Sequence, residues 1–180
     1  RKLNWKEIIK LAKNHKGKIL SDEKDYINTD SKLLWQCQIG HKWKASIGSI
    51  KYGKTWCPQC KNNYKEELTR YIFETYTGLK FNKIRPDWLK NPKTNKNLEL
   101  DGFNKENNIA FEYNGIQHYE KNDFFHNKTS LKKQTSYDEL KILLCQEKGI
   151  KLCIIKNIKD DEKLKVYIKK WLIKNNINIV

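Results

Sequence analysis

The fold of the C-terminal part of the chain is decided by two stretches, Leu98-Glu99-Leu100-Asp101-Gly102-Phe103 and Ile109-Ala110-Phe111-Glu112-Tyr113-Asn114. Their apolar residues recur at every second position, which predicts two β-strands joined by a four-residue turn at 105–108. In that hairpin Asp101 lies directly opposite Glu112, on one face of the sheet. Two facing carboxylates repel each other unless a cation compensates, and Mg²⁺ prefers such hard oxygen ligands. The pair is therefore a candidate Mg²⁺ site; the alternative is an ordinary exposed strand face that carries acidic residues.

Helical and alternating patterns surround this hairpin. The expected helices run from the cap Asn4 to His15 and over about 64–76, 131–148 and 161–174. The expected strands outside the hairpin cover about 18–20, 33–37 and 152–155. We therefore expect an α/β (α+β) protein, with a domain junction just after Cys60 that separates domains 1–62 and 63–180.

Four potential zinc ligands stand in two close pairs, Cys37 with His41 and Cys57 with Cys60, with fifteen residues between the pairs. Tetrahedral structural zinc takes four nitrogen and sulfur ligands, and each short loop can fold around one edge of the tetrahedron. The segment holds few apolar residues, so we expect bound zinc to supply much of its folding free energy. The alternative is three small buried cysteines and a surface histidine.

The charge of the chain points to a polyanionic partner. Lys and Arg total 37 against 21 acidic residues, a formal net charge of +16, and such a field favours association with nucleic acid. Nearly all of the positive charge is Lys, which suits phosphate contacts better than base reading, although an A+T-rich genome also enriches Lys. An anionic membrane surface is a distant second candidate. No apolar stretch reaches the roughly 20 residues that span a bilayer.

The cysteine count favours a reducing compartment. Five cysteines, an odd number with two in CPQC spacing, fit a metal site better than disulfides. We expect Cys145 and Cys153 to be packing residues. The expected location is cytoplasmic or nucleoid-associated, or a virus factory if the protein is viral. The sequence holds no Met, and we expect it to be part of a longer chain.

The zinc-ligand pairs lie within a more specific pattern: Trp35-Gln36-Cys37, Gly40-His41-Lys42-Trp43 and Trp56-Cys57-Pro58-Gln59-Cys60. Over about 4–61 this pattern resembles the treble-clef zinc ribbons found in strings in proteins of giant viruses, phages and bacteria. In those modules the second ligand pair opens a helix, and the resemblance implies the same here. Such modules often precede nucleases.

The acidic hairpin lies within a second pattern: Arg85-Pro86-Asp87-Trp88-Leu89, then Leu98–Gly102, then Phe111-Glu112-Tyr113-Asn114-Gly115-Ile116-Gln117-His118-Tyr119. It resembles the core of PD-(D/E)XK nucleases, and more closely the very-short-patch-repair-like and homing-type endonucleases that follow treble-clef strings. The resemblance covers roughly 64–155. It implies a restriction-endonuclease-like core, with a mixed central sheet flanked by helices.

The resemblance also implies roles for individual residues. Asp101 and Glu112 match the metal-binding carboxylates for Mg²⁺, with Mn²⁺ as a substitute, and the carbonyl of Tyr113 is the expected third ligand. Glu66 matches an acidic residue on the helix before the sheet, which can hold a metal-bound water or a second ion. Glu67 competes for that role.

The expected catalytic groups beyond the carboxylates come from the end of the second strand. Gln117 would orient the scissile phosphate or a water, and His118 would protonate a leaving oxygen or activate water. The family motif usually places Lys where this chain has Asn114, which can position a water or contact DNA but cannot act as a base. The residues expected to border the DNA cleft, unless they form a solvated helix face, are His126, Gln134, Asp138 and Lys141.

Together these features predict a Mg²⁺-dependent endonuclease that acts on double-stranded DNA, with the zinc module assisting DNA binding. One alternative is a catalytically inactive nucleic-acid-binding protein on the same fold, and the retained Asp101, Glu112 and Glu66 argue against it. Another is an RNA-directed nuclease or a mismatch-repair nickase, which sequence does not separate from the leading prediction because substrate choice depends on surface shape.

Overall fold

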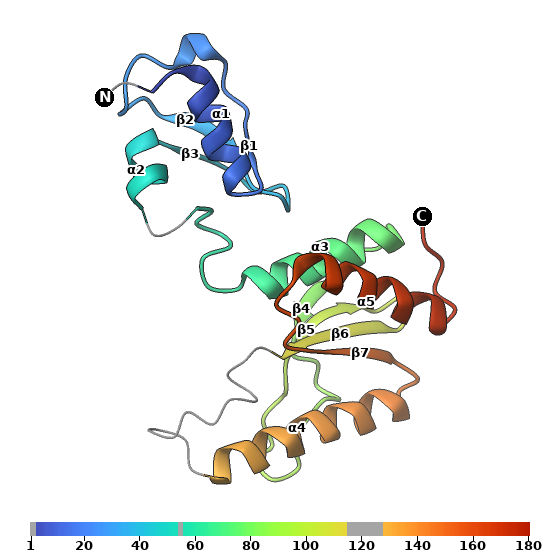
Figure 1. Ribbon diagram of the computed structural model, residues 1–180. Helices are drawn as coiled ribbons and strands as arrows, with labels where there is room; N and C mark the ends of the chain where they lie inside the picture. Colours follow the sequence, from blue (N-terminus) through green and yellow to red (C-terminus); the bar gives the residue numbers. More distant parts are fainter. Residues whose placement is uncertain (1–2, 54–55, 115–127) are drawn as a thin grey trace. The chain divides into compact units, whose positions relative to one another are not determined.

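The computed structural model describes residues 3–53, 56–114 and 128–180 and, within the fourth helix, the side chains from Tyr137 onward (Figure 1). The chain forms two compact units, residues 1–67 and 68–180. The division falls within a helix, a few residues beyond the expected junction, and the domains 1–62 and 63–180 stay a prediction. No helix of the described residues is long and apolar enough to cross a bilayer.

The N-terminal unit contains a three-stranded antiparallel sheet in the order β1-β2-β3. Its helices and strands are α1 (Trp5–Asn14), β1 (Lys18–Ile19), the short 3₁₀ helix η1 (Glu23–Asp25), β2 (Leu33–Gln36), β3 (Lys42–Ala45) and α2 (Ile47–Tyr52). The predicted cap of α1 is confirmed: the Asn4 side chain accepts from the Glu7 N–H at 2.8 Å, and the Glu7 carboxylate accepts from the Asn4 N–H at 2.8 Å.

This unit has a larger apolar core than its sequence led us to expect. Trp35 and Leu33 of β2 are fully buried, and α1 adds Ile8 while α2 adds Ile47. The core forms because α1, which precedes the zinc ligands, and α2, which lies between the two ligand pairs, each contribute one apolar face to it. Zinc therefore supplements a packed core and does not replace it.

The C-terminal unit is built on a four-stranded sheet in the order β4-β5-β6-β7. Its elements are α3 (Tyr64–Thr77, which begins in the N-terminal unit), β4 (Asn82–Ile84), β5 (Leu100–Asn104), β6 (Ile109–Asn114), α4 (Lys128–Glu147), β7 (Lys151–Lys156) and α5 (Asp161–Lys174). The pairs β4–β5 and β5–β6 are antiparallel and β6–β7 is parallel, with α4 as the crossover between the parallel strands. The mixed α/β class predicted from the sequence is thus observed, with five α-helices and two sheets in the described residues.

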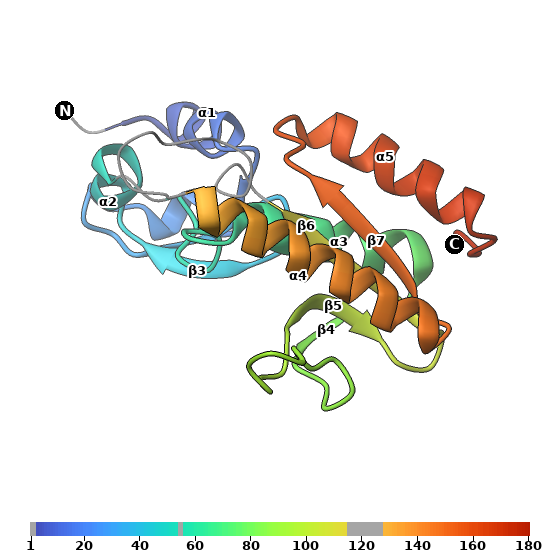
Figure 2. The same ribbon diagram turned by 90° about the horizontal axis from the view of Figure 1, so that it is seen from below.

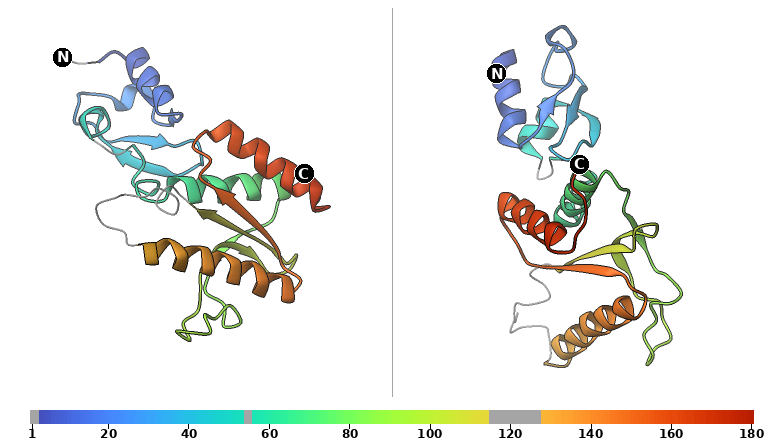
Figure 3. Two further views of the ribbon diagram at one scale, coloured as in Figure 1. Left: turned by 60° about the horizontal axis from the view of Figure 1, so that its bottom comes forward. Right: turned by 90° about the vertical axis from the view of Figure 1, so that its right-hand side faces the viewer.

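Helices cover both faces of this sheet. The helices α3 and α5 lie on one face and α4 lies on the other (Figure 3), and α4 runs along the sheet when it is seen from the α4 side (Figure 2). Phe111 of β6 is fully buried and stacks on Phe73 of α3, with ring centroids 4.8 Å apart, and Phe73 also meets Trp171 of α5. Because successive strand residues point to opposite faces, the neighbouring Glu112 points toward α4.

The predicted hairpin is confirmed. Its turn is 105–108, and the register pairs Gly102 with Phe111 and Phe103 with Ala110. Continuing this register places Asp101 opposite Glu112, as the alternating pattern predicts. Gly102 is required there because a Cβ would lie 2.1 Å from Cε1 of Phe111, closer than any side chain can approach.

Three local features differ from the expectations. The helix expected to open at the second ligand pair begins at Tyr64, because the loop after Cys57 closes into turns, with the Cys60 N–H donating to the Cys57 carbonyl at 3.2 Å. The helix α2 and the strand β4 were not predicted from the sequence. The first is six residues long and contains Gly and two β-branched Ile, and the second has three residues, too few to display a period.

Candidate metal centres

The two zinc-ligand pairs meet at the end of the β2–β3 hairpin. Cys37 follows β2, and its N–H donates to the His41 carbonyl at 3.0 Å. Gly40 closes this knuckle with a positive φ of 89°, which glycine adopts without strain. The ligand atoms of Cys37, His41, Cys57 and Cys60 all lie within 4.8 Å of one another.

The separations of these ligand atoms fit a tetrahedral zinc ion. The Sγ atoms of Cys37 and Cys60 are 3.9 Å apart, and Nδ1 of His41 lies 3.7 Å from Sγ of Cys57 and 3.4 Å from Sγ of Cys60. Ordinary Zn–S and Zn–N bond lengths give tetrahedral edges of about 3.8 Å between two sulfurs and about 3.6 Å between sulfur and nitrogen. The predicted structural zinc site, with three Cys and one His, is therefore supported by geometry.

The zinc thiols are buried, and this controls their ionisation. Burial raises the pKa of both Cys37 and Cys60, so without metal both thiols stay protonated at neutral pH. A zinc ion binds thiolates and displaces these protons. Zinc affinity should therefore increase with pH.

The tryptophans of the zinc module pack against one another. Trp56 stacks on His15 at 4.7 Å between ring centroids and meets the rings of Trp35 and Trp43 edge-on. Tyr52, at the end of α2, is 79% exposed. Trp43 and Trp56 therefore serve packing, and Tyr52 is the aromatic side chain of this group that stands in solvent.

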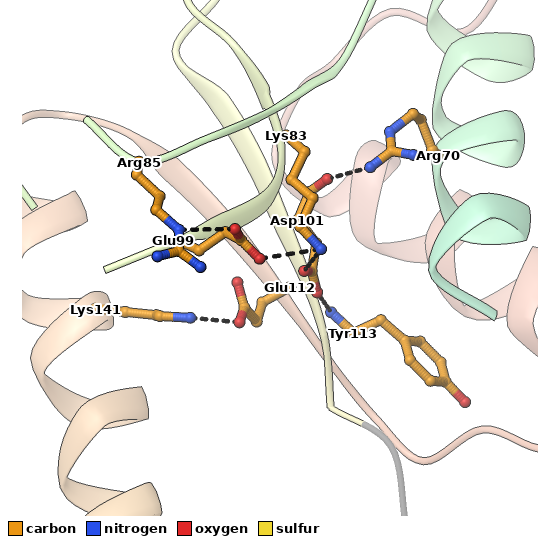
Figure 4. Close-up of polar contacts among 8 residues, drawn as sticks. All are labelled: Arg70, Lys83, Arg85, Glu99, Asp101, Glu112, Tyr113 and Lys141. Atoms are coloured by element: carbon orange, nitrogen blue, oxygen red, sulfur yellow. Dashed lines mark hydrogen bonds and ion pairs between the residues drawn. The ribbon is translucent and has the colours of Figure 1, made fainter. Parts of the chain in front are cut away.

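The second candidate centre lies on the hairpin of the C-terminal unit. Oδ2 of Asp101 accepts from the Tyr113 N–H at 2.9 Å, which ties the carboxylate to the facing strand (Figure 4). The Asp101 carbonyl accepts from the guanidinium of Arg70 at 2.6 Å, which joins β5 to α3. The two carboxylates share one face of the sheet, and Figure 4 shows the Glu112 carboxylate between Lys141 and Asp101.

Glu112 is buried and bonded to a buried cation. The ammonium of Lys141, from α4, donates to Oε1 of Glu112, while Oε2 is buried and has no hydrogen-bond partner in the described part of the chain. Burial raises the pKa of Glu112 to about 7, the charge of Asp101 adds to the rise, and the charge of Lys141 opposes it. A second cation at Oε2 would satisfy this oxygen and relieve the repulsion between the two carboxylates.

A further network borders Asp101. The ammonium of Lys83, on the edge strand β4, lies 3.6 Å from Oδ1 of Asp101 and 3.0 Å from Oε1 of Glu99, and Nε of Arg85 donates to Oε2 of Glu99 at 2.9 Å (Figure 4). Burial acts in the opposite direction, but the hydrogen bonds from Arg85 and Lys83 hold the pKa of Glu99 below its ordinary value. Glu99 thus stays ionised between two cations.

The structure places the other predicted site residues as follows. Asn114 is buried, and its amide donates to Asp138 of α4 at 3.0 Å. Glu66 and Glu67 lie in the first turn of α3. The carbonyl of Tyr113 as a ligand and the role of Glu66 stay predictions. Gln117, His118, His126 and the side chain of Gln134 lie outside the described residues.

Sequence reasoning missed the contact between Lys141 and Glu112, since it placed Lys141 at the border of a DNA cleft. A signal was present: Lys141 precedes Cys145 by four residues, on the buried stripe of α4. A Lys at such a position needs an acidic partner, because an unpaired buried charge is costly. Lys83 was missed because β4 itself was not expected.

Comparison with known proteins identifies the zinc module. Residues 13–63 match the family model described as "Probable Treble clef zinc finger domain". Together with the ligand geometry, this makes the first part of the chain a treble-clef zinc finger domain with a Cys₃His zinc site. The family model spans this part of the chain alone.

Viral proteins are among the relatives. The chain is 48% identical over 84 residues to "Uncharacterized protein 033L" of Invertebrate iridescent virus 3, covering 46% of the chain and 43% of that protein. It is 45% identical over 78 residues to "Uncharacterized protein 094L" of Frog virus 3 (isolate Goorha), covering 42% of the chain and 50% of that protein. The chain thus spans half or less of the length of these relatives.

A shorter match links the chain to a phage protein. It is 38% identical over 39 residues, 22% of the chain and 14% of the relative, to a protein of Escherichia phage T5 named "Putative endonuclease". No solved structure matches the chain.

Proposed function

We propose that the chain is a Mg²⁺-dependent endonuclease that hydrolyses phosphodiester bonds in double-stranded DNA. The observation that carries the proposal is the carboxylate pair Asp101 and Glu112 on facing strands, one face of the sheet, beside the buried ammonium of Lys141. Two carboxylate oxygens and a backbone carbonyl are ligands that Mg²⁺ takes. A metal ion held by them can activate water and stabilise the negative charge of the phosphorane-like transition state.

Lys141 supports the proposal because it supplies the cation that is missing from this chain's copy of the motif. Asn114 stands in the motif's usual Lys position and bonds to Asp138, while Lys141, one turn further along α4, reaches the second carboxylate. A fixed ammonium at this place can stabilise developing negative charge on a phosphate, since it is held in a site with little water. Lys141 would act as an electrostatic group and not as a base while it pairs with Glu112.

The rest of the chain favours a nucleic-acid substrate. The net charge of +16 attracts a polyanion, and zinc finger domains commonly bind nucleic acid. The partial likeness to a phage protein named as an endonuclease supports the same class of activity. The mixed sheet with helices on both faces is the architecture that the PD-(D/E)XK resemblance implies.

A cleavage assay tests the proposal. Supercoiled plasmid and a structured RNA are incubated with zinc-loaded protein, with and without added Mg²⁺, in buffer free of chelator because a chelator would also remove zinc. Asp101→Asn should lower plasmid cleavage by at least about 100-fold. The matched control is Glu106→Gln, which removes a negative charge from the exposed hairpin turn and should leave cleavage unchanged.

The outcomes separate the candidate functions. Equal cleavage by wild-type protein and Asp101→Asn would refute the site. DNA binding by wild-type protein without cleavage at any Mg²⁺ or Mn²⁺ concentration would favour the non-catalytic alternative. Cleavage of RNA in preference to plasmid would move the proposal to an RNA-directed nuclease.

A further inference from the structure

We propose that Lys83 is a phosphate-binding residue of this site. In the metal-free chain its ammonium neutralises Asp101. When a divalent ion and nucleic acid bind together, the ammonium moves away from Asp101 and contacts a phosphodiester. The inference rests on the proposed function and goes beyond it, because it names the residue and the coupling through which the nucleic-acid backbone enters the site. The sequence motifs contain Arg85, Glu99 and Asp101 but assign no role to Lys83.

The metal-free cluster holds as many cations as carboxylates in its ion pairs. Its ion pairs join three carboxylates to three cations: Lys83 with Asp101 and Glu99, Arg85 with Glu99, and Lys141 with Glu112. With Glu112 ionised, the formal charges within these pairs sum to zero, and the guanidinium of Arg70 adds a further cation at the Asp101 carbonyl. A divalent ion placed between Asp101 and Glu112 therefore adds two positive charges beside Lys83 and Lys141, and both ammoniums oppose its binding.

The cluster nonetheless leaves a ligand position for an ion. Oε2 of Glu112 has no hydrogen-bond partner among the described residues, although Glu112 is 91% buried and its carboxylate lies toward Asp101. A buried carboxylate oxygen without a donor is costly unless something binds it. The cluster thus offers an oxygen ligand to a divalent ion, but it lacks the net negative charge that would balance the charge of that ion.

A phosphodiester supplies that charge. Each phosphate of a nucleic-acid backbone carries one negative charge and offers oxygens to a metal ion, to ammonium groups and to guanidinium groups. Lys83 and Arg85 both lie on or beside the edge strand β4, where a ligand can approach without crossing another strand. The Lys83 side chain is 36% exposed and that of Arg85 is 66% exposed, so both can turn outward.

The two lysines therefore differ in their expected behaviour. Lys141 is buried between α4 and β6 and stays at Glu112. The Lys83 side chain is partly exposed and its ammonium lies 3.6 Å from Asp101, so this ion pair exchanges more readily than the buried pair of Lys141 and Glu112. On binding of the ion at Asp101, Lys83 becomes the cation that moves to the phosphate, with Arg85 beside it.

The prediction is a reciprocal coupling between ion and nucleic acid. Mn²⁺ is the probe because it takes the same oxygen ligands as Mg²⁺, is seen by electron paramagnetic resonance, and binds too weakly to displace zinc from a thiolate site. With zinc-loaded wild-type protein, a DNA duplex should tighten Mn²⁺ binding by about tenfold, and Mn²⁺ should tighten duplex binding by the same factor. The duplex is checked on a gel after each titration to ensure that it is intact.

Variants assign the coupling to Lys83. Lys83→Gln should tighten Mn²⁺ binding without DNA, because one opposing charge is removed, and should reduce the coupling toward unity. Lys83→Arg should restore much of it. The matched control is Lys80→Gln, since Lys80 is an exposed lysine that pairs with Glu74; it should behave as wild type.

Two results would overturn the inference, and they are distinguishable from failure of the proposed function. Mn²⁺ binding that is equal with and without duplex, or equal in wild-type protein and Lys83→Gln, overturns the role of Lys83 while leaving the carboxylate site intact. Unchanged Mn²⁺ binding in Asp101→Asn overturns the carboxylate site, and the proposed function and this inference with it.

Discussion

The ammonium of Lys141 and the carboxylate of Glu112 form a buried ion pair between α4 and β6. A second contact runs parallel to it, from the amide of Asn114 to Asp138, three residues earlier on the helix. Because residues 112 and 114 share one face of β6, the two contacts fix both the position and the rotation of α4 over the sheet. The ion pair is therefore structural as well as part of the candidate site.

Removing the Lys141 charge tests both aspects. We expect Lys141→Gln to lower the unfolding free energy by about 1–3 kcal/mol, less than the roughly 3–5 kcal/mol typical of a broken buried pair. The cost is reduced because the pKa of Glu112 is already about 7, so that its carboxyl can take up a proton when Lys141 is lost. Cleavage should fall by at least about 100-fold. Denaturant unfolding and the plasmid assay measure the two effects.

The control for this variant is Lys148→Gln, which removes an exposed lysine just past the end of α4 and should change stability by less than about 0.5 kcal/mol. If Lys141→Gln matched this control in both assays, the ion pair would have no role in fold or activity.

The pKa of Glu112 gives the site a pH dependence. A divalent ion competes with a proton for this carboxylate, and burial raises its pKa to about 7. Below pH 7 the group is mostly protonated, so we expect Mn²⁺ affinity to fall by up to about tenfold for each unit that the pH decreases, and to level off above pH 7. Calorimetric titrations between pH 6 and pH 8 would measure this, and equal affinities across the range would contradict it. Glu106→Gln, in the hairpin turn, should reproduce the wild-type profile.

The hairpin and its carboxylates could be predicted from the sequence because they depend on local rules. Alternating residues and a short turn fix the register, and the register alone places Asp101 opposite Glu112. The helix α5 also matches its predicted bounds, because its apolar residues repeat cleanly between the cap Asp160 and Asn175. In the same way, the zinc site could be predicted from its two close pairs of ligands, because the loop within each pair is short.

The cations of the site could not be predicted in the same way. Lys141 is far from Glu112 in the chain, and its role depends on how α4 packs over β6, which no local pattern specifies. Lys83 lies on a three-residue edge strand that has too few residues to show a period. The contact of Lys141 with Glu112 depends on helix packing, and the contact of Lys83 with Asp101 depends on the order of the strands. The sequence alone determines neither.

Gly102 tests the packing that supports the carboxylates from the opposite face. A Cβ at this position would lie 2.1 Å from Cε1 and 2.3 Å from Cζ of Phe111, whose ring is fully buried against Phe73. Gly102→Ala must displace the ring, and we expect a loss of about 1–3 kcal/mol of unfolding free energy, as for other overpacked cores. Since Asp101 and Glu112 flank this pair, Mn²⁺ affinity should fall as well.

The control for the glycine variant is Gly48→Ala. Gly48 lies in α2, and the nearest atom to an added Cβ is Oγ of Ser46 at 3.8 Å, an ordinary contact. This change should be neutral or slightly stabilising, because Ala favours helix more than Gly does. Chemical denaturation of both variants compares them, and an equal stability of Gly102→Ala and wild type would show that the ring can move freely.

The zinc site gives a last test, through Trp56, which precedes Cys57 in the chain and stacks on His15. Cys57→Ser replaces a thiolate ligand with a weaker hydroxyl, so zinc content should fall from about one ion per chain to nearly none. Without the ion, the segment that carries Trp56 loses its attachment to Cys37 and His41. We expect the loop that carries Trp56 to open, the N-terminal unit to lose stability, and the tryptophan emission to shift to the red. Metal analysis and fluorescence measure these changes. Cys153→Ala, which removes a buried thiol from β7, should keep its zinc, and retention of zinc by Cys57→Ser would refute the assignment of this ligand.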